Sequence, residues 1–276
     1  MKEVLGAMLR DKVGRWGLFG VLLVIIMAIT APLIAPYDPL HINTQMRFSA
    51  PCAEFLFGSD ALGRDIFSRI LYGARVSIFV GLISVGIGAG FGFAIGVISG
   101  YIGGRTDNLI MRFMDVLFAF PSILLALLIV SVLGSDIKNT MIAIGVVFIP
   151  VFVRTVRASV ITVKGMDYVQ NAKTVGVRPV WVIIRHIIPN TLSPFLVQIT
   201  LALSSAILTE STLSFLGLGI QPPNPSWGSM LAESRSLMEL APWTAVFPAL
   251  FIIMTILSFN ILGDSLRDVL DPKLKI

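Results

Sequence analysis

The residues of this chain that could do chemistry within an apolar environment are few, and Glu210 is the clearest of them. It lies inside a long apolar stretch, between Thr209 and Ser211. A carboxylate at the centre of a bilayer costs ~2.5–3.5 kcal/mol on insertion scales, so its side chain is expected to face a partner helix or a wet path. Two interpretations stay open. Thr209, Glu210 and Ser211 line a translocation route, or Glu210 is a structural hydrogen-bonding group. Asn260, in a later apolar stretch, either joins two helices or belongs to the same lining, and the first is favoured.

The residue patterns of an enzyme or a metal protein are absent from the sequence. His41 and His186 lie far apart, and Cys52 is the only cysteine, so neither a metal-ligand spacing nor an intrachain disulfide is available. No G-x-x-x-x-G-K-[ST] motif is present, so the sequence has no phosphate-binding loop of an ATPase. We therefore expect no catalytic residue, no metal site and no cofactor bound by this chain.

The glycines between positions 86 and 100 have a structural interpretation. They lack the register and the following Lys-Ser/Thr of a phosphate-binding loop, and they lie within an apolar stretch. Gly92, Gly96 and Gly100 instead predict a ridge of small residues that lets two helices approach closely.

A basic segment, 157–191, carries a helical pattern of its own. Tyr168 to Val175 is predicted to form a short helix that ends at Gly176, where a left-handed conformation costs little. A second amphipathic stretch, Val180 to Ile188, is predicted to end at Pro189-Asn190. A short exposed helix held between two membrane helices can act as a lever, because displacing it moves the helices that it joins. A helix resting on lipid headgroups would also suit the basic charge, and periodicity does not separate the two.

The elements that must hold these residues are membrane spans. Of the 276 residues, 55% are hydrophobic and only 13% are charged, against about 25% charged in an ordinary soluble domain. A bilayer core of ~30 Å requires about 20 apolar residues per helix. Pro121, inside the third of the stretches that meet this test, is expected to produce a static kink. The six predicted spans of this all-α membrane protein are 17–35, 77–100, 113–134, 140–157, 193–217 and 243–263.

Lys and Arg are distributed unequally between the two sides of these spans. The side with the N-terminus, the 101–112 and 157–191 loops and the C-terminal tail carries 14 of them, whereas the other side carries 6. By the positive-inside rule, both termini and the 157–191 loop are predicted to be cytoplasmic. Because the charges cluster between apolar stretches, the net charge of +5 does not indicate a nucleic-acid-binding face.

The chain is thus predicted to have five parts. These are a cytoplasmic N-terminal segment (1–16), a first transmembrane helix (17–35), an extracytoplasmic segment (36–76), a five-helix core that contains the 157–191 loop (77–263), and a cytoplasmic tail (264–276).

Several stretches carry a resemblance to a known family. Gln170-Asn171-Ala172-(x3)-Gly176, with Ile187-Ile188-Pro189 further on, resembles the E-A-A…G…I-x-L-P signature of permeases of binding-protein-dependent ABC importers. Further stretches, 57–65 leading into 68–75, 214–219 followed by 222–228, and 260–272, are similar to the "C" permease of the dipeptide, oligopeptide and nickel group. The resemblance runs from about residue 12 to the C-terminus.

The resemblance implies a six-helix type I ABC-importer permease in the bacterial inner membrane. It would form a heterodimer with a homologous "B" permease, while two cytoplasmic ATPase subunits bind ATP and Mg, and an extracytoplasmic solute-binding protein delivers cargo. Gln170 replaces the usual Glu of the signature, and because exposed ion pairs contribute only ~0–1 kcal/mol, docking is expected to survive. The residues implied to couple this chain to an ATPase are Tyr168, Gln170, Asn171, Ala172, Lys173, Gly176, Arg185, His186, Pro189 and Asn190.

The cargo expected from the resemblance is a di- or oligopeptide. Nickel or another metal chelate is the alternative, and glutathione- or opine-like molecules stay open. Rivals of other classes are an ion-coupled secondary transporter, which would require more intramembrane ionisable residues than Glu210, and a membrane enzyme, which would require convergent catalytic groups.

Overall fold

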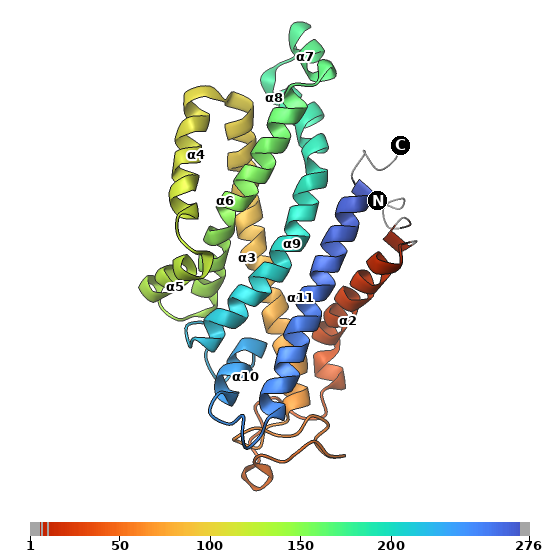
Figure 1. Cartoon of the computed structure of the whole chain (residues 1–276), viewed down its shortest axis with the longest axis vertical. Helices are drawn as coiled ribbons and strands as arrows, with labels where there is room; N and C mark the ends of the chain where they lie inside the picture. The colour runs from red at the N-terminus through yellow and green to blue at the C-terminus, as the bar shows by residue number, and fades with distance from the viewer. Residues whose placement is uncertain (1–5, 7, 10, 271–276) are drawn as a thin grey trace.

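The computed structural model describes residues 6, 8–9 and 11–270, and within these residues the chain is helical and forms no strand. Five helices are long and apolar enough to cross a membrane, and a bent pair would make a sixth span (Figure 1). The long helices are α2 (Lys12–Ile34), α3 (Ile66–Ile102), α6 (Ile137–Lys164), α9 (Ile188–Phe215) and α11 (Trp243–Leu270). The shorter elements are η1 (Thr44–Met46), α4 (Gly104–Phe118), α5 (Ser122–Leu133), α7 (Asp167–Thr174), α8 (Pro179–Val182), η2 (Ile183–Ile187) and α10 (Trp227–Ser234).

Aspartates begin three of the long helices. Asp11 accepts hydrogen bonds from the backbone N–H groups of Val13 and Gly14, and Asp65 accepts one from Ser68. Asp136 plays the same part at the start of α6. Each carboxylate satisfies a backbone donor that the first helical turn leaves free, so the sequence itself fixes where these helices start.

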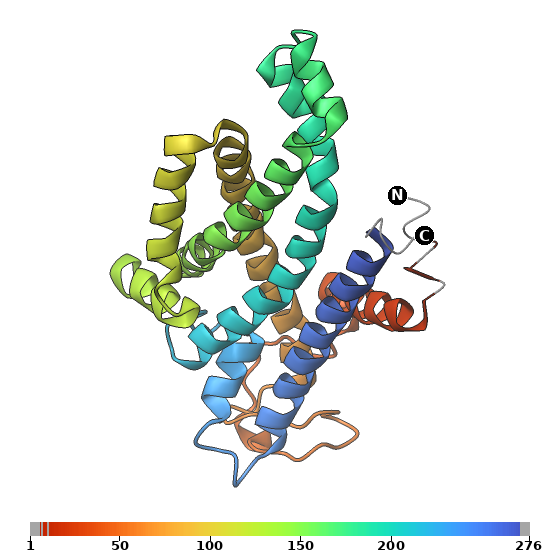
Figure 2. The ribbon, with the colours of Figure 1, turned by 45° about the horizontal axis from the view of Figure 1, so that its top comes forward.

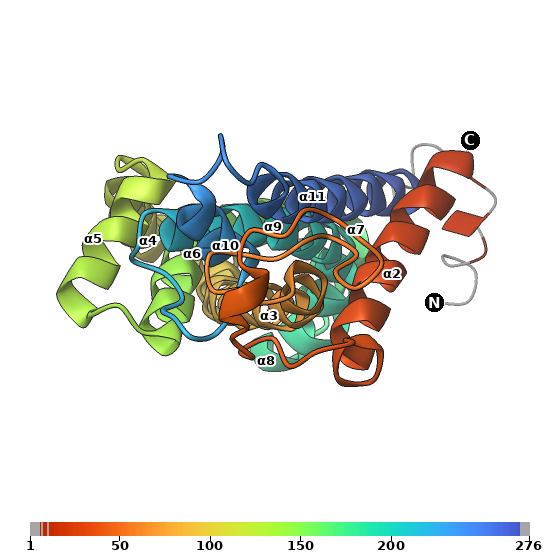
Figure 3. The same ribbon diagram turned by 90° about the horizontal axis from the view of Figure 1, so that it is seen from below.

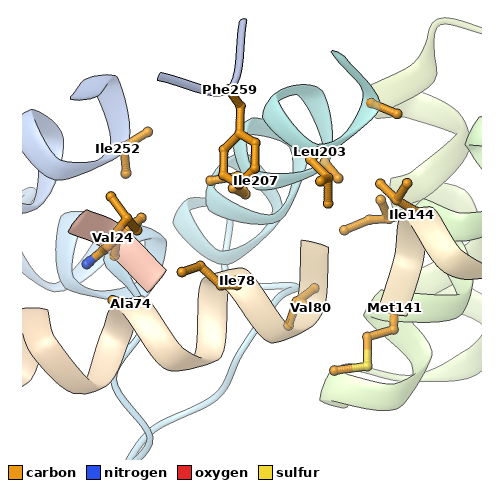
Figure 4. Packing of buried hydrophobic residues seen from close by; sticks show 14 of the residues in the cluster. Val24, Ala74, Ile78, Val80, Met141, Ile144, Leu203, Ile207, Ile252 and Phe259 are labelled. Carbon is orange, nitrogen blue, oxygen red and sulfur yellow. The ribbon is translucent and has the colours of Figure 1, made fainter. Parts of the chain in front are cut away.

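The core of the bundle is built mainly from the long helices. Most of its buried side chains come from α2, α3, α6, α9 and α11, with Ala126 of α5, Ile220 of the loop after α9 and Trp227 of α10 besides, and Figure 4 shows how several of them pack together. Many large apolar residues point outward instead, and Leu33, Ile29 and Val132 are more than two-thirds exposed. In water such a surface would be costly, whereas against lipid it is the ordinary exterior of a membrane protein.

The predicted glycine ridge is confirmed, and its partner is α6. A Cβ atom added to Gly96 would lie 2.8 Å from the Cβ of Val156, and one added to Gly100 would lie 2.9 Å from the Cβ of Val160. The same face continues through Gly88 and Gly92 against Phe148 and Phe152. Only glycine permits this approach of the two backbones.

The third predicted span, 113–134, is not one kinked helix. α4 and α5 meet at an angle of 87°, with residues 119–121 between them. Pro121 has no N–H to continue the helix and is extended, at φ −55° and ψ 132°. The static kink expected at this proline is therefore a full change of direction, and α5 begins anew at Ser122.

The other boundaries differ from the predicted ones by extension of helices. α3 begins at Ile66, inside the segment predicted as 36–76, and α6 continues to Lys164, inside the predicted 157–191 loop. The stretch expected to end at Pro189 continues without a break, since Pro179–Phe215 forms one helical run of 37 residues. A π-helical turn precedes the proline, in which the N–H of Ile188 bonds to the carbonyl of Ile183, five residues back. Pro189 then lies in the first turn of α9, where its missing N–H donor costs no hydrogen bond.

The two ends of the bundle differ in character. α7 lies at one end, and α2 begins and α11 ends towards that same end (Figures 1 and 2). The opposite end carries the irregular segment 35–65, which passes across the start of α3 beside α10 (Figure 3). The side of the membrane that each end faces stays a prediction, and Lys2, Arg10, Lys273 and Lys275, on which the charge count partly rested, lie outside the described residues.

Candidate functional site

The helix α7 is the part of the molecule best placed to be moved from outside. It is eight residues long and is carried between two long helical elements, α6 and the 179–215 run. Gly165 closes α6 by donating its N–H to the carbonyls of Ile161 and Thr162, and α7 begins two residues later. So short a connection leaves α7 little freedom relative to α6.

Gly176 ends α7 as predicted, in a left-handed conformation at φ +81°. The N–H of Gly176 bonds to the carbonyl of Lys173, and the N–H of Val177 bonds to that of Ala172. This pair of bonds is the Schellman arrangement, which satisfies the last carbonyls of a helix. The chain therefore reverses within two residues and enters α8 at Pro179.

The underside of α7 is fixed to the bundle by one apolar side chain. Val169 is fully buried, in a cluster with Val97 of α3, Val160 of α6 and Val182 and Ile187 of the 179–215 run. Val156 and Val163 of α6 complete the cluster. Because the cluster contains side chains from both helices that α7 joins, a force applied to α7 is transmitted to both.

The outward face of α7 is polar and open. Tyr168 is 41% exposed, Gln170 and Asn171 are exposed, and Ala172 is half-buried beside them. The Gln170 amide donates a 2.6 Å hydrogen bond to the carbonyl of Lys164, at the end of α6. A glutamate has no donor for that bond, so the Gln at this position contributes locally to the α6–α7 connection.

Cations surround the base of α7. Lys164 donates to the carbonyl of Tyr101 at 2.5 Å, and Lys164 and Lys173 both place their ammonium groups near the Tyr101 ring, at 5.5 and 5.6 Å. Burial, and after it the neighbouring Lys164, lower the pKa of Lys173. Next to them Arg157 forms a bidentate pair with Asp107 of α4, at 2.5 Å for both bonds. This end of the bundle thus combines a basic surface with a firm tie between α4 and α6.

The remaining residues of the predicted coupling loop lie on the helical run that leaves α8. Arg185 and His186 lie in the π-helical turn, and the His186 ring is 6.2 Å from that of Tyr168. Asn190 donates to the carbonyl of His186, and Pro189 is exposed beside it. The structure therefore brings the ten predicted residues to one end of the molecule, on α7 and the adjacent helical run.

Glu210 lies in a pocket of hydroxyl groups near the other end. It is fully buried and accepts hydrogen bonds from Ser214 at 2.8 Å, Ser77 of α3 at 3.2 Å and, more weakly, Ser211 at 3.4 Å. Ser214 in turn accepts the N–H of Ile220, in the loop after α9. This geometry matches the structural interpretation of Glu210, since the carboxylate joins α3, α9 and that loop.

The four residues predicted to line a path do not share one surface. Thr209 is half-buried and bonds back to its own helix, whereas Glu210 and Ser211 are buried. Asn260 of α11 accepts a 2.6 Å hydrogen bond from Ser204 of α9. Asn260 therefore joins two helices, which is the role that the sequence favours for it. Their pathway role stays a prediction.

Sequence reasoning missed an ion-pair network at the end opposite α7. Arg64 bonds to Asp60 and to Glu233 of α10, each at 2.6 Å, and Arg69 of α3 bonds to Glu233 at 3.0 Å although it is only 1% exposed. The network ties the 35–65 segment and α10 to the start of α3. Asp60 and Arg64 have the spacing of an i, i+4 pair, but nothing in the sequence connects them with Glu233.

Comparison with known proteins gives a consistent result. The family described as binding-protein-dependent transport system inner membrane component matches residues 92–276, and the N-terminal TM domain of oligopeptide transport permease C matches residues 1–51. The dipeptide transport system permease protein DppC of Alkalihalophilus pseudofirmus is 44% identical over 274 residues, which are 99% of this chain and 90% of that protein. The glutathione transport system permease protein GsiD of Escherichia coli is 48% identical over 256 residues, 92% of this chain and 84% of that protein.

A solved structure gives independent support for the fold. The crystal structure of an amino acid ABC transporter with histidines aligns with a TM-score of 0.57 at 14% identity, over 73% of this chain and 94% of that one. At that identity the likeness concerns the arrangement of helices alone.

Proposed function

The chain belongs to the family of binding-protein-dependent transport system inner membrane components, within its peptide-importer group of ABC permeases, and from this premise we propose that it forms the import path for short peptides. It does so with a homologous "B" permease, as a heterodimer. A solute-binding protein delivers the peptide on the extracytoplasmic side, and two ATPase subunits, which bind ATP and Mg, drive the cycle from the cytoplasm through the 168–190 loop.

One observation supports the coupling role above the others, namely the way α7 is mounted. It presents an open polar face, while Val169 fixes its underside to a cluster shared by α3, α6 and the 179–215 run. A partner that grips α7 would therefore move two long helices together. Switching between two states requires such an element, on which nucleotide binding in the partner can act.

Short peptides are the cargo that the relatives favour. One of them is named for dipeptide transport, and the other for the transport of glutathione, which is itself a short peptide. Nickel or another metal chelate stays the alternative cargo for the same machine. Nothing in the comparisons supports an ion-coupled secondary transporter.

Cross-linking tests the coupling. In a variant whose Cys52 is replaced by Ser, Asn171→Cys is expected to form a cross-link with a cysteine in the docking groove of an ATPase subunit. It should also resist a membrane-impermeant maleimide added to intact cells. Lys138→Cys, exposed at the opposite end of α6, is the control and should show the reverse of both results. Labelling of position 171 from outside would contradict the proposed orientation and coupling together.

Transport assays test the cargo. Vesicles that contain both permeases and both ATPases are mixed with loaded binding protein in the surrounding buffer. They should accumulate a labelled dipeptide only when ATP is present. An excess of unlabelled dipeptide should compete, and a nickel chelate should not. Competition by the chelate alone would overturn the peptide assignment and leave the permease assignment intact.

A further inference from the structure

At the end of the bundle opposite α7, three segments enclose a hollow that the coupling role does not use. Its volume is about 340 Å³, within the ~300–1,000 Å³ range of small-molecule sites. The segment after α2 contributes Asp38, α3 contributes Tyr72, Arg75 and Val76, and the loop before α10 contributes Asn224 and Pro225. Segments distant in the sequence thus meet around one space.

The polar groups in this hollow are largely free. Arg75 is exposed, and within the described part of the chain it has no carboxylate in ion-pair range, lying only beside the Tyr72 ring at 5.9 Å. One oxygen of Asp38 accepts the N–H of Leu40, while the other has no protein donor among the described residues. The Tyr72 hydroxyl and the Asn224 amide also border the hollow, and neither side chain makes a hydrogen bond within residues 11–270. Four groups with unused hydrogen-bonding capacity therefore border the same space.

The charges of these groups specify a class of ligand. A guanidinium presents several donors in a fork that fits a carboxylate or phosphate, whereas a free carboxylate oxygen accepts from an ammonium. Asp38 and Arg75 border one hollow but are not paired with each other at 4.0 Å or less. Val76 and Pro225 add apolar surface to the same hollow. The hollow thus offers a cationic position, an anionic position and an apolar wall.

We propose that this hollow binds a free peptide as a zwitterion, with Arg75 on the terminal carboxylate and Asp38 on the terminal ammonium. This inference rests on the proposed function, which puts this end on the side from which cargo arrives. The other source of an oxyanion for Arg75 is the phosphate of a lipid headgroup, because arginines near the start of a membrane span extend towards that layer. Tyr72 and Asn224 serve as further hydrogen-bonding groups for the peptide.

The test uses the complete importer in vesicles, with binding protein pre-loaded at saturation so that its own affinity does not limit the rate. The probes are a free dipeptide and the same dipeptide amidated at its C-terminus, and both uptake and ATP hydrolysis are measured. Wild type should move about tenfold less amide than free acid per ATP, since a charge-assisted contact is lost. Arg75→Gln should lower uptake of the free acid about tenfold, leave that of the amide unchanged, and keep ATP hydrolysis within twofold. Arg235→Gln, an exposed arginine at the same end outside the hollow, is the matched control and should resemble wild type.

Other outcomes would overturn the inference in distinguishable ways. Equal losses for acid and amide in Arg75→Gln would show that Arg75 does not bind the peptide carboxylate. A loss of ATP hydrolysis stimulated by empty binding protein would assign Arg75 to a protein contact instead. Wild-type uptake that falls to the Arg75→Gln level in vesicles of galactolipid, which lacks phosphate, would assign Arg75 to a lipid headgroup.

A separate experiment tests the proposed contact between Asp38 and the terminal ammonium of the peptide. Asp38→Asn should abolish the preference of wild type for the free dipeptide over the N-acetylated one, and a retained preference would remove the ammonium site. If the chain were not part of a peptide importer at all, wild type would move no peptide in any arm. Failure of the present inference alone would leave wild-type uptake of the free dipeptide intact.

Discussion

The attachment of α7 through Val169 permits a quantitative test of coupling. Val169 is fully buried in the valine-rich cluster at the base of α7. Val169→Ala removes two methyl groups at ~0.8 kcal/mol each and leaves a cavity, so α7 should be held less firmly by about 1.5–2.5 kcal/mol. That corresponds to a roughly tenfold to seventyfold larger population in which α7 is detached. Val169→Asn adds the cost of a buried amide without partners, ~1–3 kcal/mol more.

The assay compares two rates in vesicles that contain the whole importer. Peptide uptake and phosphate release are measured together, and their ratio gives the peptide moved per ATP consumed. We expect this ratio to fall about twofold for Val169→Ala and more than tenfold for Val169→Asn, because the ATPases still cycle while the loosened helix transmits less of their movement.

The matched control makes the same two changes at Val24, which is 3% exposed in the core beside α11. These variants should lower the melting temperature of the purified complex by a similar amount without changing the transport ratio. If both Val169 variants melted earlier yet moved as much peptide per ATP as wild type, rigid mounting of α7 would not matter to transport, and the lever interpretation would be refuted.

Three further expectations concern single positions. Glu210→Gln keeps an acceptor for the surrounding serines and should lower the melting temperature in detergent far less than Glu210→Ala, which leaves several buried hydroxyls unpaired at ~1–3 kcal/mol each; equal shifts would contradict the structural role. Gly96→Leu should sharply reduce the amount of protein in the membrane because it forces α3 and α6 apart. Gly86→Leu, whose side chain would meet open space, should be tolerated. Similar yields of the two variants on immunoblots would count against the glycine ridge. Gln170→Glu loses the donor to the Lys164 carbonyl but should keep uptake within about threefold, so a loss beyond tenfold would show that the amide itself is required.

The features that the sequence predicted well are those whose causes lie close together along the chain. The end of α7 at Gly176 follows from a glycine placed after about two turns of helical pattern, and the structure has it at φ +81°. The glycine ridge likewise follows from a spacing of four residues in an apolar stretch. Such signals need no knowledge of the partner, because any helix that packs there must come close.

The features that could not be predicted depend on distant residues or on a local alternative to the α-helix. Glu233 lies 164 residues from Arg69, and Ser77 lies 133 residues from Glu210, so one sequence contains no signal that pairs them. Pro189 was expected to end a helix, but a π-turn absorbs its missing donor. Pro121 was expected to kink a span, and the change of direction there is 87°. A proline marks a disturbance of the helix, while its neighbours in space decide how large the disturbance is.

The helical run Pro179–Phe215 has a consequence for how the two ends of the molecule communicate. Its 37 residues amount to ~55 Å of helix, whereas the bilayer core is only ~30 Å thick. One continuous helical run thus begins beside the surface that a motor would hold and finishes at the serines around Glu210, next to the loop that carries Asn224. Tilting such a run about a pivot within the membrane swings its two tips in opposite directions, so opening at one mouth and closure at the other follow from a single movement.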